Sequence, residues 1–113
     1  MDAIEEAEFL ARSENRVAVL RLVAAERHSR AALADAVDVS QATLGRILED
    51  FSERSWIRHE GTGYVATATG ELVATAVTDL VETLQAEQTL RDVVRYLPTH
   101  AMEFDLRRLA DAE

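Results

Sequence analysis

Hydrophobic residues near the middle of the chain recur at helical spacing in two adjacent short segments. Residues 30–37 carry one apolar stripe: Ala32, Leu33, Ala36 and Val37. Residues 41–54 place large apolar side chains at i, i+3, i+4 and i+7: Leu44, Ile47, Leu48 and Phe51. Ser40 is predicted to cap the second segment, because its hydroxyl can accept from a free backbone N–H of the first turn. Two short helices joined by a tight turn predict a helix-turn-helix.

The flanking segments predict further helices and one hairpin. Apolar stripes predict helices over residues 2–11, 14–28 (capped by Ser13), 70–97 and 100–112. Two β-prone runs, residues 56–60 and 64–67, are separated by Gly61-Thr62-Gly63, which predicts a tight hairpin with a three-residue loop. A hairpin directly after the second short helix completes a winged helix-turn-helix.

The fold class that follows is mainly α with a small β-hairpin, in three parts. Residues 1–12 form an N-terminal helix, and residues 13–70 form the winged helix-turn-helix domain. Residues 71–113 contain the long helix, opened by Thr69 or Gly70, and the terminal helix. We expect this last part to serve in dimerisation or to begin a further C-terminal domain. At 113 residues the chain has room for one modest core.

Composition indicates neither an enzyme nor a metal protein. The chain has no cysteine, which excludes disulfides, thiolate ligands and a cysteine nucleophile. The three histidines, His28, His59 and His100, are dispersed and lack metal-ligand spacing. No phosphate-binding glycine loop or nucleophile motif occurs, so no cofactor is expected. The acidic N-terminus does not resemble a signal peptide and no run is long enough to span a bilayer, so we expect a cytoplasmic protein without a membrane partner.

The charge balance is unusual for a nucleic-acid-binding protein. The formal net charge is −9, and all 12 cations are arginine. Acidity without lysine resembles the proteins of salt-loving archaea, although a GC-rich genome would also deplete lysine. An acidic protein can still bind DNA if its few cations gather on one face, with specific hydrogen bonds replacing diffuse attraction.

Three runs of residues carry a family resemblance. They are Val39-Ser40-x-x-Thr43-Leu44-x-Arg46-x-Leu48, Phe51-x-x-Arg54-Ser55-Trp56-Ile57 and Tyr64-x-x-Thr67-x-x-Gly70. Over residues 13–75 the chain resembles archaeal winged-helix transcriptional regulators of the MarR/ArsR-like superfamily, and haloarchaeal members in particular. Several of those regulators carry a C-terminal sensor or regulatory domain, so the sequence is expected to be either the N-terminal piece of a longer regulator or a short natural protein without that domain. Ser55 stands where the family usually has glycine, which favours a positive φ.

A helix-turn-helix inserts the N-terminal turns of its second helix into the major groove. The candidate contacts there are Gln41, Ala42, Thr43, Gly45 and Arg46. We expect Arg46 to bind guanine O6 and N7, Gln41 to bind adenine, and Thr43 to contact a thymine methyl or a phosphate. Gly45 would allow close approach of the backbone. The alternative for Arg46 is a surface ion pair with Asp50.

Further candidates surround this helix. Ser40 could bind phosphate as well as cap the helix. Arg58, His59 and Thr62 lie on or beside the predicted wing, which commonly contacts the minor groove or the backbone. Arg30 and Arg54 are phosphate candidates. Acidic residues should lie beyond the contact zone: Glu49, Glu53 and Glu60.

The helices outside the winged domain also carry apolar stripes, which favours a homodimer in which they pack together and across a two-fold axis. The candidate contacts are Phe9, Leu72, Val73, Val77, Leu80, Leu84 and Leu90. A dimer would place two recognition helices about 34 Å apart on double-stranded DNA. Intramolecular packing or a further domain are alternatives. The competing function is a winged-helix module that binds protein without contacting bases, and the residues indicate no effector.

Overall fold

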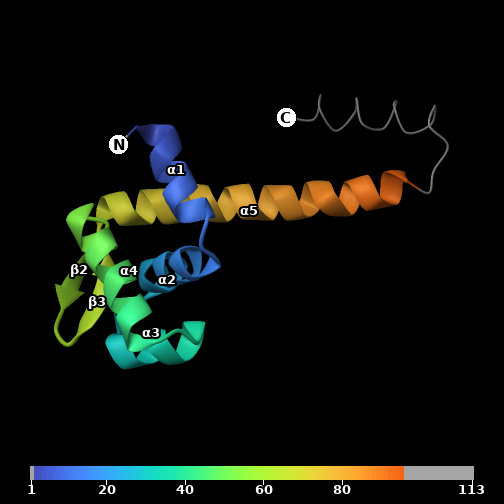
Figure 1. Ribbon diagram of the computed structural model, residues 1–113. Coiled ribbons are helices and arrows are strands. Elements are labelled where there is room, and N and C mark those ends of the chain that lie inside the picture. The colour runs from blue at the N-terminus through green and yellow to red at the C-terminus, as the bar shows by residue number, and fades with distance from the viewer. Residues whose placement is uncertain (1, 96–113) are drawn as a thin grey trace. The chain divides into compact units, whose positions relative to one another are not determined.

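The computed structural model describes residues 2–95. Residues 2–78 belong to one compact unit and residues 79–95 to a second. The first unit contains these complete elements: α1 (Ala3–Ala11), α2 (Glu14–Ala25), β1 (His28–Ser29), α3 (Arg30–Val37), α4 (Gln41–Glu53), β2 (Ile57–Glu60) and β3 (Gly63–Ala66). The last helix, α5 (Ala68–Val94), begins in the first unit and continues in the second. Helices with a small antiparallel sheet confirm the predicted fold class (Figure 1).

The short helices begin at capping side chains. The hydroxyl of Ser13 accepts a hydrogen bond from Arg16 N (3.2 Å), and that of Ser40 accepts from Thr43 N (3.1 Å). Ser29 caps α3 in the same way. Each cap satisfies one backbone donor that a helix leaves free in its first turn. The helix starts predicted at Ser13 and Ser40 are therefore confirmed.

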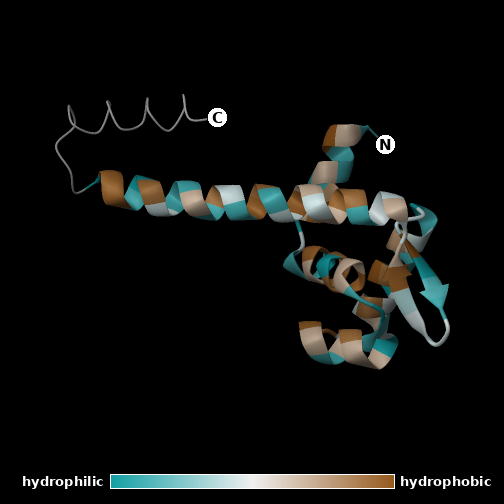
Figure 2. Cartoon of the chain, turned by 180° about the vertical axis from the view of Figure 1, so that it is seen from behind, coloured by the Kyte–Doolittle hydropathy of each residue, from teal (hydrophilic) through white to brown (hydrophobic). Residues whose placement is uncertain are grey.

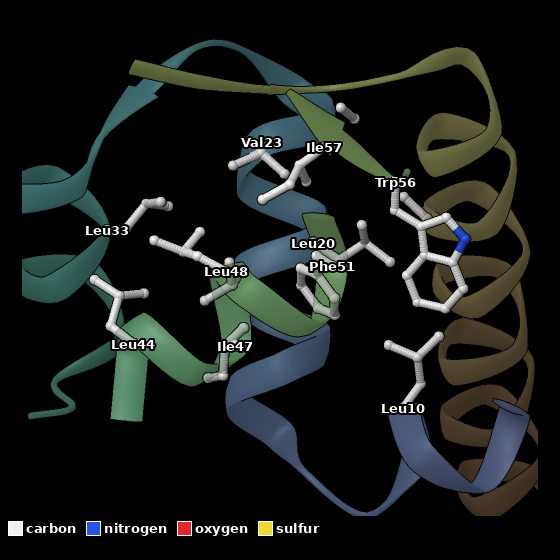
Figure 3. Packing of buried hydrophobic residues seen from close by; sticks show 13 residues of the cluster. Leu10, Leu20, Val23, Leu33, Leu44, Ile47, Leu48, Phe51, Trp56 and Ile57 are labelled. Atoms are coloured by element: carbon white, nitrogen blue, oxygen red, sulfur yellow. The ribbon is translucent and has the colours of Figure 1, made fainter. Parts of the chain in front are cut away.

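One hydrophobic cluster holds the first unit together, and α4 is its centre. The four predicted residues of α4 are all buried: Leu44, Ile47, Leu48 and Phe51. They pack against Leu20 and Val23 of α2, Leu33 of α3, and Trp56 and Ile57 near the start of the hairpin (Figure 3). Removing a fully buried ring such as that of Phe51 typically costs about 3–5 kcal/mol of folding stability.

Two predictions were wrong in detail, the end of α2 and the length of the hairpin turn, and one strand was not predicted. α2 ends at Ala25 rather than His28, because residues 26–29 place no apolar side chain in the core. The backbone becomes extended after Ala25. His28 and Ser29 form β1, which pairs with Tyr64 and Gly63 of β3 and gives a sheet of order β1-β3-β2. The hairpin turn has two residues, not three, because Gly63 pairs with Glu60 inside the ladder.

The junction between the hairpin and α5 explains the Tyr-x-x-Thr-x-x-Gly run. Thr67 Oγ1 accepts from Gly70 N (3.1 Å) and so caps α5, which begins at Ala68, slightly before the predicted start. A Cβ on Gly70 would lie 1.9 Å from the carbonyl oxygen of Trp56. Only glycine permits this approach of helix to hairpin.

The second unit, as far as it is described, is the continuation of α5. Arg91 Nε donates to Glu87 Oε2 (2.9 Å), and this hydrogen bond lowers the pKa of the Glu87 carboxyl below its ordinary value. The predicted terminal helix over residues 100–112 and the predicted end of the long helix near Leu97 lie outside the described residues. No helix within residues 2–95 is long and apolar enough to cross a membrane.

Ser55 follows α4 in the left-handed region, with φ +58°. Its carbonyl oxygen accepts hydrogen bonds from the hydroxyls of Thr67 (2.6 Å) and Thr69 (3.2 Å), which fix this conformation. The conformation costs a residue with a Cβ about 1–2 kcal/mol, and glycine avoids most of that cost.

We therefore expect Ser55→Gly to raise stability by about 0.5–1 kcal/mol, which corresponds to a few degrees in Tm. Ser52→Gly is the matched control, because Ser52 lies within α4 and glycine there lowers stability by a similar amount. Thermal unfolding followed by circular dichroism measures both. Equal destabilisation by the two changes would contradict the strain argument.

Candidate nucleic-acid interface

Burial of one face of α4 leaves its other face in solvent. The residues of α4 that are exposed in its first two turns are Gln41, Ala42, Thr43 and Arg46. Ile47, next to Arg46 in the chain, is buried and keeps α4 from rotating about its axis. The structure therefore brings the predicted recognition residues together on one accessible surface at the start of the helix.

Arg46 is the exposed cation of this surface. Within residues 2–95 its guanidinium makes no ion pair, and the alternative pair with Asp50 is absent. Five N–H donors of a guanidinium remain for a ligand. The side chain is thus placed to bind an external acceptor such as a guanine edge or a phosphate.

The first turn of α4 is held by a network around Ser40. Its hydroxyl accepts from Thr43 N and donates to Thr43 Oγ1 (3.0 Å). This reciprocal arrangement fixes the Thr43 rotamer. Both side chains are exposed, so the Ser40 cap and the Thr43 hydroxyl lie at the same end of the helix as Arg46.

Arg30, at the start of α3, reaches onto α4. Its Nε donates to Gln41 Oε1 (3.2 Å), and its Nη2 donates to the main-chain oxygen of Gln41 (3.2 Å). A Cβ on Gly45 would lie 2.9 Å from Arg30 Nη2. Gly45 therefore makes room for an arginine of the same chain, which differs from its predicted use in close approach to DNA.

The wing offers fewer free groups than predicted. Arg58 forms an ion pair with Glu60 (3.3 Å) on the same strand, so its guanidinium already has a partner. The ring of His59 packs on that of Tyr64, with centroids 4.4 Å apart. Thr62 is exposed in the turn. β2 is largely hydrophilic, as an exposed strand requires (Figure 2).

Arg27 is a wing residue that the sequence did not indicate. Its side chain follows β3: a Cβ on Gly63 would lie 2.8 Å from Arg27 Cγ, and one on Gly61 would lie 3.1 Å from Nη1. The guanidinium thus lies beside the hairpin turn, and no ion pair engages it within the described part of the chain. Gly61 and Gly63 were the available signal in the sequence. Arg27 reaches these glycines only because β1 pairs with β3, and the sequence did not predict β1.

Arg54 and Phe9 belong to the interior packing of the first unit. The guanidinium of Arg54 lies 3.9 Å from the Phe9 ring centroid and pairs with Glu6 (3.0 Å). Arg16 lies over the same ring at 4.1 Å, and Phe51 contacts it edge-on. These contacts attach α1 to the end of α4 and engage both Arg54 and Phe9 inside the first unit.

Carboxylates also border the interface. Glu49 and Glu53 are exposed on the later turns of α4, C-terminal to Arg46. They follow the turns that a recognition helix normally inserts. Among residues 2–95 no group of three or more acidic or histidine side chains is arranged to hold a metal ion.

The dimer candidates on α5 differ in exposure. In the first unit Leu72 is 71% exposed, whereas Val73 packs against the core and Val77 is half-buried. In the second unit Leu80 and Leu84 are 56% and 48% exposed, and Leu90 is half-buried. Two exposed leucines four residues apart form an apolar strip on one helical face.

Comparison with known proteins identifies the fold. The family model described as the HVO_A0261 N-terminal domain matches residues 4–89. The structure is similar to the MarR family protein Rv2887 of Mycobacterium tuberculosis, with 18% identity over 91% of this chain and 78% of that chain and a TM-score of 0.62.

A second similar protein is ZitR of Lactococcus lactis, a zinc-responsive MarR family member, with 18% identity over 88% of this chain and 73% of that chain and a TM-score of 0.56. ZitR in complex with DNA gives 19% identity, coverages of 87% and 70%, and a TM-score of 0.54. At these identities the likeness establishes the fold alone. No curated protein matches the sequence significantly.

Proposed function

This chain belongs to the HVO_A0261 N-terminal domain family, and from that premise we propose that it is a sequence-specific DNA-binding transcriptional regulator without enzymatic activity. The observation that carries the proposal is the exposed N-terminal surface of α4, where Arg46 has no ion-pair partner within residues 2–95. ZitR, which is similar in fold, has a structure in complex with DNA, and this supports the proposal that the same fold binds DNA here. The protein would act in the cytoplasm, where prokaryotic DNA lies.

In this proposal α4 enters the major groove and the hairpin contacts the minor groove or the backbone. Arg46, Gln41 and Thr43 face base edges, and Ala42 lies among them at the helix surface. Arg27 and Thr62 face the backbone from the wing, and Arg58 and His59 line the wing strand. Ser40 and Arg30 stand at the first turn of α4. Arg54 is left out, because its guanidinium is occupied inside the fold.

We further propose that two copies bind DNA together, through the exposed apolar strip on α5. Full burial of a leucine side chain stabilises an interface by about 1.5–3 kcal/mol. The chain gains this free energy only if another surface covers Leu80 and Leu84. A two-fold dimer presents two equal surfaces to a pseudo-palindromic site.

Replacing Arg46 by alanine tests the base contact. After selection of a binding site from random duplex DNA, Arg46→Ala should lower affinity for that site by about 1–3 kcal/mol and relax preference at one base pair. Arg12→Ala is the control, because it removes the same charge from an exposed pair with Glu8 on α1. A wild type that selects no sequence would contradict the proposal and favour the alternative, a protein-binding module.

The dependence of binding on salt tests the role of charge. Proteins with 6–10 phosphate contacts lose about 10³–10⁵ in affinity between 50 and 200 mM salt. With Arg27 and Arg30 as the phosphate-facing cations of each copy, a dimer would make about four such contacts, so we expect a shallower slope of log affinity against log KCl. Arg27→Ala should reduce that slope further and leave base preference unchanged. A slope as steep as that of a basic repressor would contradict this proposal.

Introducing negative charge on α5 by substitution tests the dimer proposal. The double variant Leu80→Glu, Leu84→Glu should be monomeric, with a mass near 12.5 kDa by light scattering, because an unpaired carboxylate in an apolar contact is strongly disfavoured. Gln85→Glu with Thr89→Glu adds the same charge to other faces of the helix and should stay dimeric. A monomeric wild type would rule the dimer out.

A further inference from the structure

We propose that Gln41, the first residue of the recognition helix, turns its amide N–H donors outward, and that it therefore selects guanine rather than adenine in the major groove. The inference rests on the proposed DNA-binding function and adds the base that the surface selects. It follows from how Arg30 holds the first residue of the helix.

The Arg30 guanidinium fixes the orientation of the Gln41 side chain. A guanidinium has donors and no acceptor, so the amide atom that faces Arg30 Nε at 3.2 Å must be the oxygen. The second contact, from Nη2 to the Gln41 main-chain oxygen at 3.2 Å, ties the same guanidinium to the helix itself. The Gln41 NH₂ group is thus turned away from Arg30, on an exposed side chain.

Gly45 is what permits this arrangement. In an α-helix the carbonyl of residue 41 faces the amide of residue 45, so a guanidinium bound to that carbonyl lies against residue 45. A Cβ at this position would come within 2.9 Å of Arg30 Nη2 and 3.9 Å of Cζ. The displaced atoms are the far end of a flexible side chain, so an added methyl group would move Arg30 and leave the fold intact.

The neighbouring guanidinium groups add further donors. Thr43 Oγ1 accepts from the Ser40 hydroxyl (3.0 Å), and its own proton and one lone pair remain for an external partner. Arg46 has donors only. Arg30 has further N–H groups beyond the two that it uses on Gln41. Donors from α3 and α4 therefore converge at the start of the recognition helix.

An outward donor at Gln41 discriminates among base edges. Guanine presents two acceptors, N7 and O6, whereas adenine pairs its N7 acceptor with an N6 donor and cytosine presents an N4 donor. Glutamine binds adenine only when its oxygen and its nitrogen both face the base. With its oxygen directed at Arg30, Gln41 cannot place oxygen and nitrogen on adenine together, and guanine, which needs donors alone, becomes the better partner. This departs from the adenine contact that the sequence alone predicted for Gln41.

Binding-site selection with the full chain and a random duplex library tests the inference. The wild type should select guanine at the base pair that depends on residue 41. Gln41→Glu keeps an oxygen for Arg30 but replaces the outward NH₂ by an acceptor, so that base pair should change to cytosine, with a preference of about fivefold or more. Gly45→Ala should displace Arg30, free the amide and admit adenine. Arg12→Ala should select the wild-type site.

The outcomes separate this inference from the function on which it rests. A wild type that selects no sequence contradicts the proposed function itself. A wild type that selects a defined site with adenine at the residue-41 base pair, or a site that Gln41→Glu and Gly45→Ala both leave unchanged, overturns the outward donor at Gln41 while DNA binding stands. If these donors bind phosphates, both variants should leave the selected site unchanged, because phosphate contacts carry no base preference.

Discussion

The burial of one face of α4 is the constraint on which the rest of the molecule depends. Leu44 and Phe51 are completely buried, and together they fix both the depth of the helix and its rotation about its axis. Since 3.6 residues make one turn, fixing two positions a full two turns apart fixes the direction of every other side chain. Arg46 and Thr43 are exposed for this reason alone, and any change that loosened Phe51 would also misdirect them.

Local patterns in the sequence predicted this arrangement, because they need no partner elsewhere in the chain. The i, i+3, i+4, i+7 spacing located α4, and the hydroxyl of Ser40 located its start. The resemblance to archaeal winged-helix regulators, and to haloarchaeal members in particular, is confirmed by the family match and by the fold. Its most specific run proved to be structural: Thr67 caps α5, and Gly70 lets that helix approach the carbonyl of Trp56.

What the sequence did not predict depends on contacts between distant residues. β1 exists because the backbone of His28 pairs with that of Tyr64, which no side-chain pattern encodes. Arg54 was expected at a phosphate, yet it meets Glu6, 48 residues earlier in the chain. The arginine side chain is long enough to reach several partners. Its position in the sequence therefore says little about which partner it binds.

The placement of the arginines also answers how a chain of net charge −9 could present cations to DNA. Three of its four glycines lie under arginine side chains: Gly45 beneath Arg30, and Gly61 and Gly63 beneath Arg27. The missing Cβ atoms leave room for Arg30 Nη2 at Gly45 and for the Arg27 side chain beside the hairpin turn, and hydrogen bonds to Gln41 also hold Arg30. In concentrated salt the Debye length falls to about 3 Å at 1 M, so only cations in direct contact contribute. A few arginines held at fixed positions then matter more than the total charge, and the acidic remainder of the surface does not oppose binding at a distance.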